Sequence, residues 1–478
     1  MQKTKGPFLA GETIEEQYAF MAQVRQLIGE DASLLGGAAK AMVITYGCQQ
    51  NENDSEMIRG MLVKMGFSIT EDKEQATFVL LNTCAIRDSA EKKVYGKLGE
   101  FAAMKRENPQ MIVALCGCMA QQEHVQIAVK QKYRQVDLVF ATHSLYMFPK
   151  LLYQALRERQ RIFSVDQSDG HIAEGLPVQR NDPFRANVPI MYGCNNFCSY
   201  CVVPFVRGRE RSRRPENILE EIRALAAAGV KDITLLGQNV NSYGKTLEEP
   251  MSFPELLYKI NDIEGDFRLR FMTSHPKDAT DELFSAIRDC AKLVRHVHLP
   301  IQSGSNRVLS QMNRGYTRES YLEKLSRLRS AVPEVSVTSD IIVGFPTETE
   351  EEFLETISLV KAARFDLLYT FLYSKRPGTP AFSMEGQIAK SEQQRRFDLL
   401  LKEQNQLSRE SNNACIGTVQ RVLVEGESKN DPEMMTGRSD ANKVVNFKAD
   451  KGTIGQFLSL KITDCKTWWL LGEQADKG

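Results

Sequence analysis

The sequence has no surplus of charge of either sign, because 61 lysines and arginines are matched by 61 aspartates and glutamates. A neutral chain has no general attraction for nucleic acid, so any RNA binding must come from local basic patches. The sequence also lacks an apolar run near the ~18 residues of a membrane span. Residues 1–20 lack the apolar core of a signal peptide. These absences predict a cytoplasmic protein that does not contact a membrane.

Cysteine, in contrast, is plentiful, with ten in 478 residues. In a reducing compartment these are not expected to form a disulfide framework, so metal binding or catalysis becomes the better explanation. The chain is long enough for two or three domains, and its composition is that of a globular protein.

The first half of the chain predicts a helical extension and an α/β domain. Residues 1–38 have helix-like spacing and carry no evident chemistry. From 39 to 165, short apolar runs alternate with helix-like stretches, as in βαβ units around a parallel sheet. The predicted strands are AMVITY, TFVLLN, MIVALC and VDLVFA.

Residues 166–188 are polar, contain Gly and Pro, and read as a linker. The alternation resumes over 189–410, where six strand–helix repeats predict an α/β barrel or an open parallel sheet. This region ends in a charged helix at 388–412. The tail, 413–478, has short alternating strands separated by Gly and Asp, which predicts a small all-β barrel.

Three cysteines lie within the stretch YGCNNFCSYC, at Cys194, Cys198 and Cys201. The spacing also fits one face of a helix, but the neighbouring Gly, Asn and Ser residues and Pro204 favour a loop. A 4Fe–4S cluster held by three thiolates keeps one iron without a protein ligand. Such an open position is what distinguishes a reactive metal site from a structural one.

A second trio of cysteines follows three predicted strands. Cys48, Cys84 and Cys118 each lie just past a strand in a polar or Gly-containing turn. The carboxyl ends of parallel strands share one edge, so these thiols are expected to converge on a second cluster; the alternative is that each is buried packing. Cys116 is interpreted as packing, and Cys290, Cys415 and Cys465 as structural.

Polar motifs follow the strands of the central region: LLGQNVNSYG, TSHPKD, LPIQSGSNRVLSQMNRGYTRE and DIIVGFPTETEEEF. Together with the cysteine loop and the arginines after it, they resemble the radical S-adenosylmethionine (SAM) enzymes. The earlier cysteine trio and the β-rich tail resemble one subgroup, the methylthiotransferases of the MiaB type. The resemblance covers about 40–478. One departure is Thr347, at a position where glycine is expected.

The resemblance implies a radical SAM (β/α)6 partial barrel, a C-terminal TRAM domain, two 4Fe–4S clusters and SAM as cofactors. It also implies that SAM is cleaved reductively to a radical that abstracts hydrogen from the substrate, and that chemistry occurs at the clusters without a general acid or base. The predicted SAM contacts are Tyr200, Gln238, Ser274, Gln302 and Asp340. The alternatives are core packing for Tyr200 and strand-end capping for the other four.

An arginine run, RGRERSRR, follows the cysteine loop directly. A charge run is usually a solvated surface, but arginine also binds phosphate and stacks on bases, so RNA contact is the competing interpretation. The five arginines are Arg207, Arg209, Arg211, Arg213 and Arg214. In the tail, possible RNA contacts are Arg438, Lys443 and one of the adjacent Trp468 and Trp469.

The expected reaction, as the resemblance implies it, adds a methylthio group to carbon 2 of N6-isopentenyladenosine beside the tRNA anticodon, at position 37. Alternatives are threonylcarbamoyladenosine in tRNA, an aspartate of a ribosomal protein, or a non-catalytic iron–sulfur protein that binds RNA. The arginine run favours a polyanion over a protein substrate. The expected partners are a tRNA anticodon stem-loop and an electron donor such as flavodoxin or ferredoxin, with the chain acting as a monomer.

Overall fold

The computed structural model describes residues 8–475 except 32, 86–87, 166–167 and 430. The first seven residues of the expected extension, the first two of the expected linker and the last three of the tail lie outside the described residues. Two compact units make up the chain. The first comprises Met1–Asn181, Tyr192–Asn195 and Cys201–Arg211, and the second comprises Asp182–Met191, Asn196–Tyr200 and Ser212–Gly478. Within the described residues, no helix has the length and apolar character to span a bilayer.

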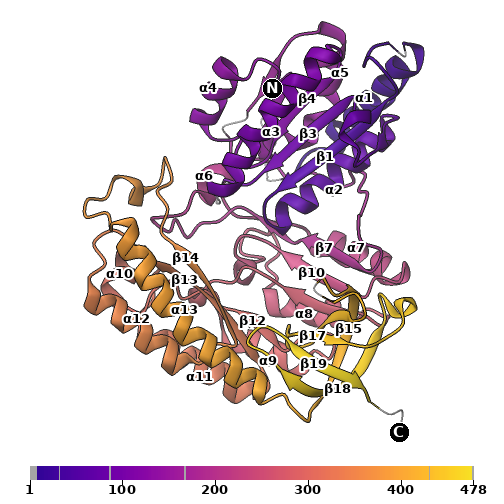
Figure 1. The fold of residues 1–478 in the computed structure, drawn as a ribbon. Coiled ribbons are helices and arrows are strands. Elements are labelled where there is room, and N and C mark those ends of the chain that lie inside the picture. Colours follow the sequence, from indigo (N-terminus) through magenta and orange to yellow (C-terminus); the bar gives the residue numbers. More distant parts are fainter. Residues whose placement is uncertain (1–7, 32, 86–87, 166–167, 430, 476–478) are drawn as a thin grey trace. The chain divides into compact units, whose positions relative to one another are not determined.

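The first unit is built on a six-stranded parallel sheet in the order β2-β1-β3-β4-β5-β6. Figure 1 shows β1, β3 and β4 side by side in this sheet. Its strands are β1 (Lys40–Tyr46), β2 (Ser68–Ile69), β3 (Phe78–Thr83), β4 (Ile112–Cys116), β5 (Leu138–Phe140) and β6 (Ile162–Ser164). The helices are α1 (Gly11–Glu30), α2 (Gln49–Lys64), α3 (Asp88–Glu107), α4 (Glu123–Lys132), α5 (Phe148–Glu158) and α6 (Val203–Arg207), with short 3₁₀ turns η1 (Lys73–Gln75) and η2 (Thr142–Met147). The predicted parallel-sheet domain is confirmed.

Both faces of this sheet are buried because successive side chains point to opposite sides and both sides are apolar. In β3, for example, Phe78 and Leu80 join one core cluster, which includes α1, α2 and α5. Val79 and Leu81 join a second cluster on the other face, with α3 and α4. The near-continuous apolar runs in the sequence therefore reflect a sheet covered by helices on both sides.

The second unit contains the six parallel strands that the sequence analysis expects. They are β7 (Arg185–Pro189), β10 (Asp232–Leu236), β11 (Arg268–Phe271), β12 (His296–His298), β13 (Ser336–Val343) and β14 (Leu367–Leu372). Two three-stranded sheets, β11-β10-β7 and β12-β13-β14, are linked by a bridge between Leu269 and Leu293. This is the strand arrangement of a partial barrel, and it encloses a large apolar core.

Helices connect these strands and cover the partial barrel (Figure 1). They are α7 (Pro215–Ala227), α8 (Phe253–Asn261), α9 (Asp281–Asp289), α10 (Asn306–Gln311), α11 (Arg318–Ala331), α12 (Glu350–Ala363) and α13 (Lys390–Asn413). Short 3₁₀ turns are η3 (Val240–Ser242), η4 (Pro276–Asp278) and η5 (Pro380–Ser383). Two short strands, β8 (Met191–Tyr192) and β9 (Arg211–Ser212), flank the cysteine loop in the sequence.

The tail forms a closed barrel in the order β15-β16-β17-β19-β18, as the sequence analysis predicts. Its elements are β15 (Val419–Glu427), β16 (Met435–Ser439), β17 (Val444–Phe447), η6 (Lys451–Thr453), β18 (Phe457–Cys465) and β19 (Leu470–Gln474). Val422, Val445, Phe447 and Leu460 fill its small core.

The end of β16 and the turn that follows it contact the amino ends of the partial-barrel strands. Arg268 donates to the carbonyl of Arg438 (2.7 Å), and Arg270 donates to Asn442 Oδ1 (2.9 Å). Lys443 Nζ pairs with Asp366 just before β14 (3.0 Å). Arg268 is almost fully buried and also pairs with Asp232. The tail barrel and the partial barrel are therefore joined by buried charged groups.

Candidate active site

The first cysteine trio lies at the carboxyl ends of three adjacent strands. Cys48 precedes α2 as its N-cap, Cys84 follows β3 directly, and Cys118 follows β4 by two residues. The strands β1, β3 and β4 are neighbours in the sheet, and their pairing aligns Tyr46 with Thr83 and Asn82 with Cys116. The strand-end placement expected from the sequence is therefore present in the fold.

The thiols of this trio interact with one another electrostatically. The Cys84 thiol donates a hydrogen bond to Cys48 and, with the positive charge of Arg207, lowers the pKa of Cys48 to about 6 against the effect of desolvation. Burial raises the pKa of Cys118 in spite of Arg207. A thiolate is the form of cysteine that binds metal, and the lowered pKa favours that form at Cys48 while the Cys84 thiol is protonated.

Arg207 is the main charged neighbour of the trio. It is 5% exposed. Its Nε donates to Cys118 Sγ (3.0 Å), and its Nη2 pairs with Asp54 Oδ2 of α2 (2.7 Å). Arg207 is one of the five arginines predicted as candidate RNA contacts, and that role stays a prediction. Its guanidinium lies against a cysteine of the first trio.

Glycine is needed at position 117, between the end of β4 and Cys118. Gly117 has φ +91°, and a Cβ there would lie 2.3 Å from Asn82 Oδ1. Asn82 in turn donates to the carbonyl of Asn51 (2.9 Å) and to Ser55 Oγ (2.9 Å), so a polar network lies behind the cysteines. Because Gly117 lies close to Asn82, the chain can turn directly after Cys116. The side chain of Cys116 is buried in the core.

The donor chemistry of this trio fits an iron–sulfur cluster, because it supplies three cysteine sulfurs at one sheet edge. Across the parts of the chain that the structure describes, no group of three or more His, Cys, Asp or Glu side chains has the arrangement of a metal-binding cluster. Ligation by Cys48, Cys84 and Cys118 therefore stays a prediction that rests on placement and chemistry.

The second trio lies on the loop where the chain passes between units. Cys194 and Cys201 belong to the first unit and Cys198 to the second. Gly193 before the loop has φ +76°, and a Cβ there would overlap the carbonyl oxygen of Arg209, so only glycine fits. The residues form a loop with no helix between Gly193 and Val202, which agrees with the loop interpretation.

Arg314 has the same relation to this trio that Arg207 has to the first. It is 4% exposed, and its Nη1 donates to Cys198 Sγ (3.2 Å) and to the Tyr200 hydroxyl (3.4 Å). Its Nη2 donates to the carbonyl of Pro300 (2.9 Å). Sequence reasoning did not identify Arg314, although it lies in the quoted motif MNRGYTRE.

The five predicted SAM contacts all belong to the second unit. Gln238 and Ser274 follow the carboxyl ends of β10 and β11, which are adjacent strands. Gln302 follows β12, and its backbone N–H donates to the carbonyl of Asp340 in β13 (2.9 Å). The side chain of Ser274 is buried, and its hydroxyl has no hydrogen-bond partner among the described residues.

Tyr200 is partly buried against an apolar cluster that includes Val308, Met312 and Phe345. This is the packing alternative named for it, and a role at the SAM adenine stays a prediction. Asp340 lies 3.4 Å from His298 Nε2, while His298 Nδ1 bonds with Thr338 (2.9 Å). The polar side chains of β12 and β13 therefore contact one another within the partial barrel.

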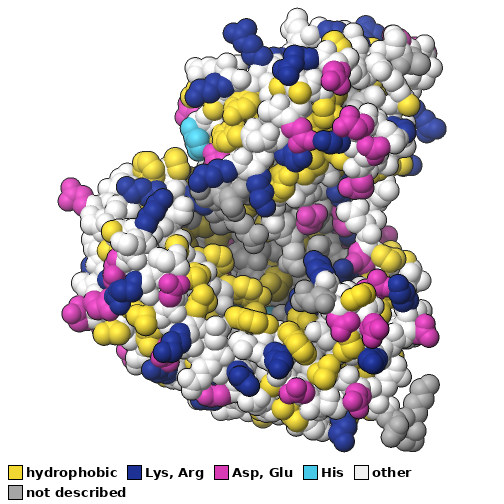
Figure 2. All heavy atoms as spheres, viewed as in Figure 1, with side chains coloured by type: hydrophobic (Ala, Val, Ile, Leu, Met, Phe, Trp, Pro, Cys, Tyr) yellow, Lys and Arg dark blue, Asp and Glu magenta, His cyan; other side chains and the backbone are white. Residues whose placement is uncertain are grey.

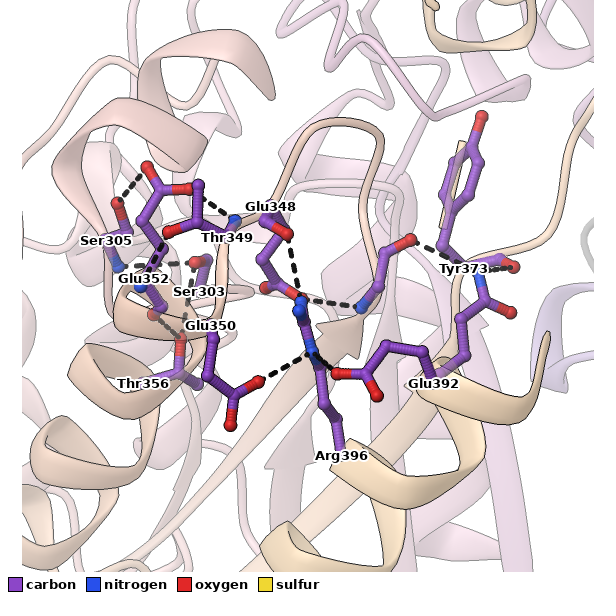
Figure 3. A network of polar contacts seen from close by, with 12 residues as sticks. Ser303, Ser305, Glu348, Thr349, Glu350, Glu352, Thr356, Tyr373, Glu392 and Arg396 are labelled. Atoms are coloured by element: carbon purple, nitrogen blue, oxygen red, sulfur yellow. Dashed lines mark hydrogen bonds and ion pairs between the residues drawn. The ribbon is translucent and has the colours of Figure 1, made fainter. Parts of the chain in front are cut away.

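The loop after β13, which carries the GFPTET motif, is fixed by a network of ion pairs and caps (Figure 3). Glu348 accepts from the backbone N–H of Gly344 (2.9 Å) and pairs with Arg396 of α13 (2.9 Å). Thr349 caps α12 through a reciprocal contact with Glu352. Thr347, the departure noted above, has φ +65°, a conformation that favours glycine.

The arginines of the RGRERSRR run divide into two sets. Arg209 and Arg214 are exposed. The other three are buried: Arg207, Arg211 and Arg213. Arg213 donates to the carbonyl of Pro189 (2.7 Å) and to Glu221 (2.9 Å). RNA contact by this run stays a prediction, and Arg209 and Arg214 are the two that present exposed side chains to a phosphate.

In the tail barrel, Trp468 is 54% exposed while Trp469 is partly buried, so Trp468 is the one available as a stacking surface. The ammonium of Lys443 bonds with Asp366, Ser411 and Asn412, and RNA contact by Lys443 stays a prediction. On the face shown in Figure 2, blue and magenta side chains are interspersed, as the neutral composition predicts.

The second unit also contains a cavity of about 450 Å³ beside the ends of β10 and β11. Lys245, Lys277, Asp278 and Phe253 are among its lining residues. None of the five predicted SAM contacts lines it, so this cavity is separate from the predicted cofactor contacts.

Comparison with known proteins identifies the family. Residues 188–360 match the radical SAM superfamily, residues 40–141 match the uncharacterized protein family UPF0004, and residues 413–474 match the TRAM domain. A protein of Acetivibrio thermocellus named tRNA-2-methylthio-N(6)-dimethylallyladenosine synthase is 47% identical over 98% of both chains. A protein of that name from Thermoanaerobacter pseudethanolicus is 50% identical over 90% of this chain and 91% of its own. The chain belongs to the radical SAM methylthiotransferases of this type.

Solved structures support the fold of this methylthiotransferase. The radical S-adenosylmethionine methyltransferase TsrM from Kitasatospora setae matches with a TM-score of 0.54 and 15% identity, covering 80% of this chain and 78% of its own. The cofactors of the methylthiotransferase are SAM and two 4Fe–4S clusters. The two cysteine trios agree with that number of clusters and with thiolate ligands. The TRAM domain and the relatives support tRNA as a binding partner.

Proposed function

We propose that this chain adds a methylthio group to carbon 2 of N6-isopentenyladenosine at position 37 of tRNA, next to the anticodon. The observation that carries the proposal is the similarity to proteins named for this reaction along almost the entire chain, from the first cysteine trio to the TRAM barrel. The name of those relatives specifies a dimethylallyl adenosine. Among the residues that the structure describes, no feature favours threonylcarbamoyladenosine or a protein aspartate over it.

In this proposal, Cys194, Cys198 and Cys201 hold the cluster that binds SAM, and Cys48, Cys84 and Cys118 hold the auxiliary cluster. When bound, the clusters and SAM supply the radical and methyl-transfer chemistry that side chains lack. The protein contributes binding, orientation and exclusion of water. Arg314 and Arg207 each donate a hydrogen bond to one cysteine sulfur.

The five polar or aromatic candidates described above orient SAM in this proposal. Ser274 supports it, because a buried hydroxyl without a partner among the described residues is suited to a bound ligand. The exposed Arg209 and Arg214 contact phosphates of the anticodon stem-loop, whose loop bases are already partly unstacked. The protein acts in the cytoplasm as a monomer and accepts electrons from flavodoxin or ferredoxin.

The domain division that accompanies this proposal is the one predicted from sequence: an N-terminal methylthiotransferase domain at 39–165, a radical SAM core at 189–410, and a TRAM domain at 413–478. The segment 166–188 links the first two. The residue ranges matched by the three families are compatible with this division.

Nucleoside mass spectrometry of tRNA from a deletion strain tests the reaction. We expect 2-methylthio-N6-isopentenyladenosine to disappear and N6-isopentenyladenosine to accumulate, and the wild-type gene to reverse both changes. Unchanged 2-methylthio-N6-isopentenyladenosine in the deletion strain would refute the proposed substrate.

The same strain tests the cysteine assignments. We expect Cys198→Ala and Cys118→Ala to fail in complementation and to lower the iron content of the anaerobically reconstituted protein. Cys415→Ala is the matched control, since Cys415 lies just after α13 and outside both trios. Full complementation by either trio variant would overturn the ligand role of that cysteine.

A further inference from the structure

One face of β14 exposes two aromatic side chains. Phe371 is 45% exposed and Tyr369 is 40% exposed. The two residues alternate along the strand, so their side chains lie on the same face. Leu368, on the opposite face, joins the apolar core that the strands share with the helices. Tyr369 packs edge-on against His298 of β12, with ring centroids 5.7 Å apart. The exposed face is therefore the one that lines the interior of the partial barrel.

This face is open because β14 is the last strand of its sheet. It pairs with β13 along one edge, and among the described residues no strand pairs with the other edge. Neighbouring apolar side chains that are exposed on an edge strand are a liability for a soluble protein, because they favour aggregation. We therefore expect a ligand to cover this face when the enzyme is at work.

The register of β13 and β14 places Phe371 near the reacting end of the partial barrel. Phe371 lies opposite Ile342, and Tyr369 lies opposite Asp340, one of the predicted SAM contacts. The pair of Phe371 and Ile342 is the nearer of the two to the carboxyl ends of the strands, where barrels of this kind carry their active sites. Ile342 also packs against the apolar cluster that Tyr200 of the cysteine loop contacts. A substrate group on Phe371 thus lies beside the predicted cofactor contacts.

The pair of Phe371 and Ile342 differs in chemistry from the interior below it. Toward the amino ends of the strands the interior side chains are polar, and His298 Nδ1 bonds with Thr338 Oγ1 (2.9 Å). Phe371 and Ile342 supply only hydrocarbon. A charged or polar group buried against them would lose its water without gaining a hydrogen bond, which is unfavourable. This part of the interior is therefore suited to an apolar group.

We propose that Phe371 and Ile342 form the contact surface for the isopentenyl group of the substrate adenosine and determine specificity for it. The inference rests on the proposed function, which supplies this substrate. The isopentenyl group is the only wholly aliphatic part of the substrate nucleotide, since its base, sugar and phosphate carry polar atoms. A threonylcarbamoyl group carries a carboxylate, and the nearest cation along the chain, Lys375, has its ammonium over the ring of Phe382 (6.0 Å). The apolar pair therefore favours an isopentenyl group over a threonylcarbamoyl group at the same nitrogen.

The affinity of the cluster-loaded protein for two anticodon stem-loops tests this contact. The two RNAs differ only in whether the adenosine at position 37 carries the isopentenyl group. We expect the wild type to bind the prenylated RNA roughly tenfold more tightly, because an aliphatic group is removed from water. In Phe371→Ala this ratio should fall toward one, while the affinity for the unmodified RNA stays unchanged. Fluorescence anisotropy measures both affinities.

Three further variants control for the loss of a large side chain. Leu354→Ala is the matched control, because Leu354 is an apolar residue of the helix α12 and is 51% exposed. It should keep the wild-type ratio. Phe371→Leu, which keeps an apolar side chain, should retain most of the preference. Phe371→Gln should lose it, and this variant replaces Phe371→Ala if thermal unfolding shows that the alanine variant does not fold.

The outcomes separate this inference from the proposed function. An unchanged ratio in Phe371→Ala would overturn the isopentenyl contact and leave the proposed reaction standing. An equal loss of affinity for both RNAs would also overturn it, because the ring would then serve as a surface for a base that both RNAs share. If the deletion strain keeps its methylthiolated tRNA while Phe371→Ala abolishes the preference for the prenylated RNA, the proposed function fails and the isopentenyl contact stands.

Discussion

Arg314 and Arg207 are buried cations that each donate a hydrogen bond to a cysteine sulfur, one in each trio. The distances are 3.2 Å to Cys198 and 3.0 Å to Cys118. Hydrogen bonds to the sulfurs are one of the factors that set the reduction potential of an iron–sulfur cluster. A nearby positive charge also favours the reduced state, which carries one more negative charge. Both effects act in the same direction.

We therefore expect Arg314→Met to lower the reduction potential of the cluster held by Cys194, Cys198 and Cys201, and to slow reductive cleavage of SAM. Potentiometric titration followed by electron paramagnetic resonance measures the potential. Arg318→Met is the matched control, because the half-buried Arg318 donates from its guanidinium to the Glu355 carbonyl and to Ser358 Oγ and, within the described residues, not to a cysteine sulfur. An unchanged potential in a folded Arg314→Met protein would contradict the role given to this hydrogen bond.

At the level of residues, these two arginines show which contacts could not be predicted from the sequence. The placement of Cys48, Cys84 and Cys118 could be predicted, because strand ends follow from apolar runs in the sequence. The pairing of Arg314 with Cys198, separated by 116 residues, depends on tertiary packing that no local pattern encodes. The burial of Arg207, Arg211 and Arg213 could not be predicted either. A run of charged residues usually lies on the surface, and only tertiary packing buries these three.

At the level of elements, α13 fixes the loop that follows β13. Arg396 of α13 is buried, and it pairs with Glu348 (2.9 Å) and with Glu392 (2.7 Å) (Figure 3). Glu348 also accepts from the Gly344 backbone, so one carboxylate connects the strand end to the helix. Loss of the arginine would leave a buried carboxylate without its counterion, a change that is strongly destabilising.

We expect Arg396→Ala to reduce the free energy of unfolding by about 3 to 5 kcal/mol, measured by chemical denaturation of the purified protein. The adjacent Arg395 is an exposed residue that pairs with Glu350 and Glu392. Arg395→Ala should therefore change stability by less than about 1 kcal/mol. Equal losses of unfolding free energy in the two variants would show that the buried ion pair with Glu348 contributes no more stability than the exposed ion pairs of Arg395.

Most helices and strands could be predicted because their apolar residues recur at regular spacing. The elements that were missed have a weak apolar pattern. The charged helix predicted at 388–412 corresponds to α13, which spans Lys390–Asn413. In contrast, β7 begins at Arg185, inside the segment predicted to be a linker. Its first residues are polar, and the strand is defined by parallel pairing with β10 rather than by an apolar run. The short strands β2 and β6, which are absent from the predicted set, were missed for the same reason.

At the scale of the whole molecule, the TRAM barrel offers one exposed tryptophan as a platform for RNA. We expect Trp468→Ala to weaken tRNA binding by about 1 to 3 kcal/mol, the usual contribution of stacking on one base. Fluorescence anisotropy with a labelled anticodon stem-loop measures the affinity. Trp469→Ala is the informative comparison, because Trp469 is partly buried and should chiefly lower thermal stability. Unaltered affinity in Trp468→Ala would exclude this surface from RNA binding.

The contact between the β16–β17 turn and the partial barrel limits how the protein can be recombined with its relatives. Arg268 and Arg270 extend from β11 to the backbone of Arg438 and to Asn442, and Lys443 reaches back to Asp366. A chimaera with a foreign TRAM barrel would keep the buried Arg268 and Arg270 but would lose the turn whose groups accept their hydrogen bonds. Exchange of the tail is therefore expected to succeed only when the donor supplies a matching turn at 438–443.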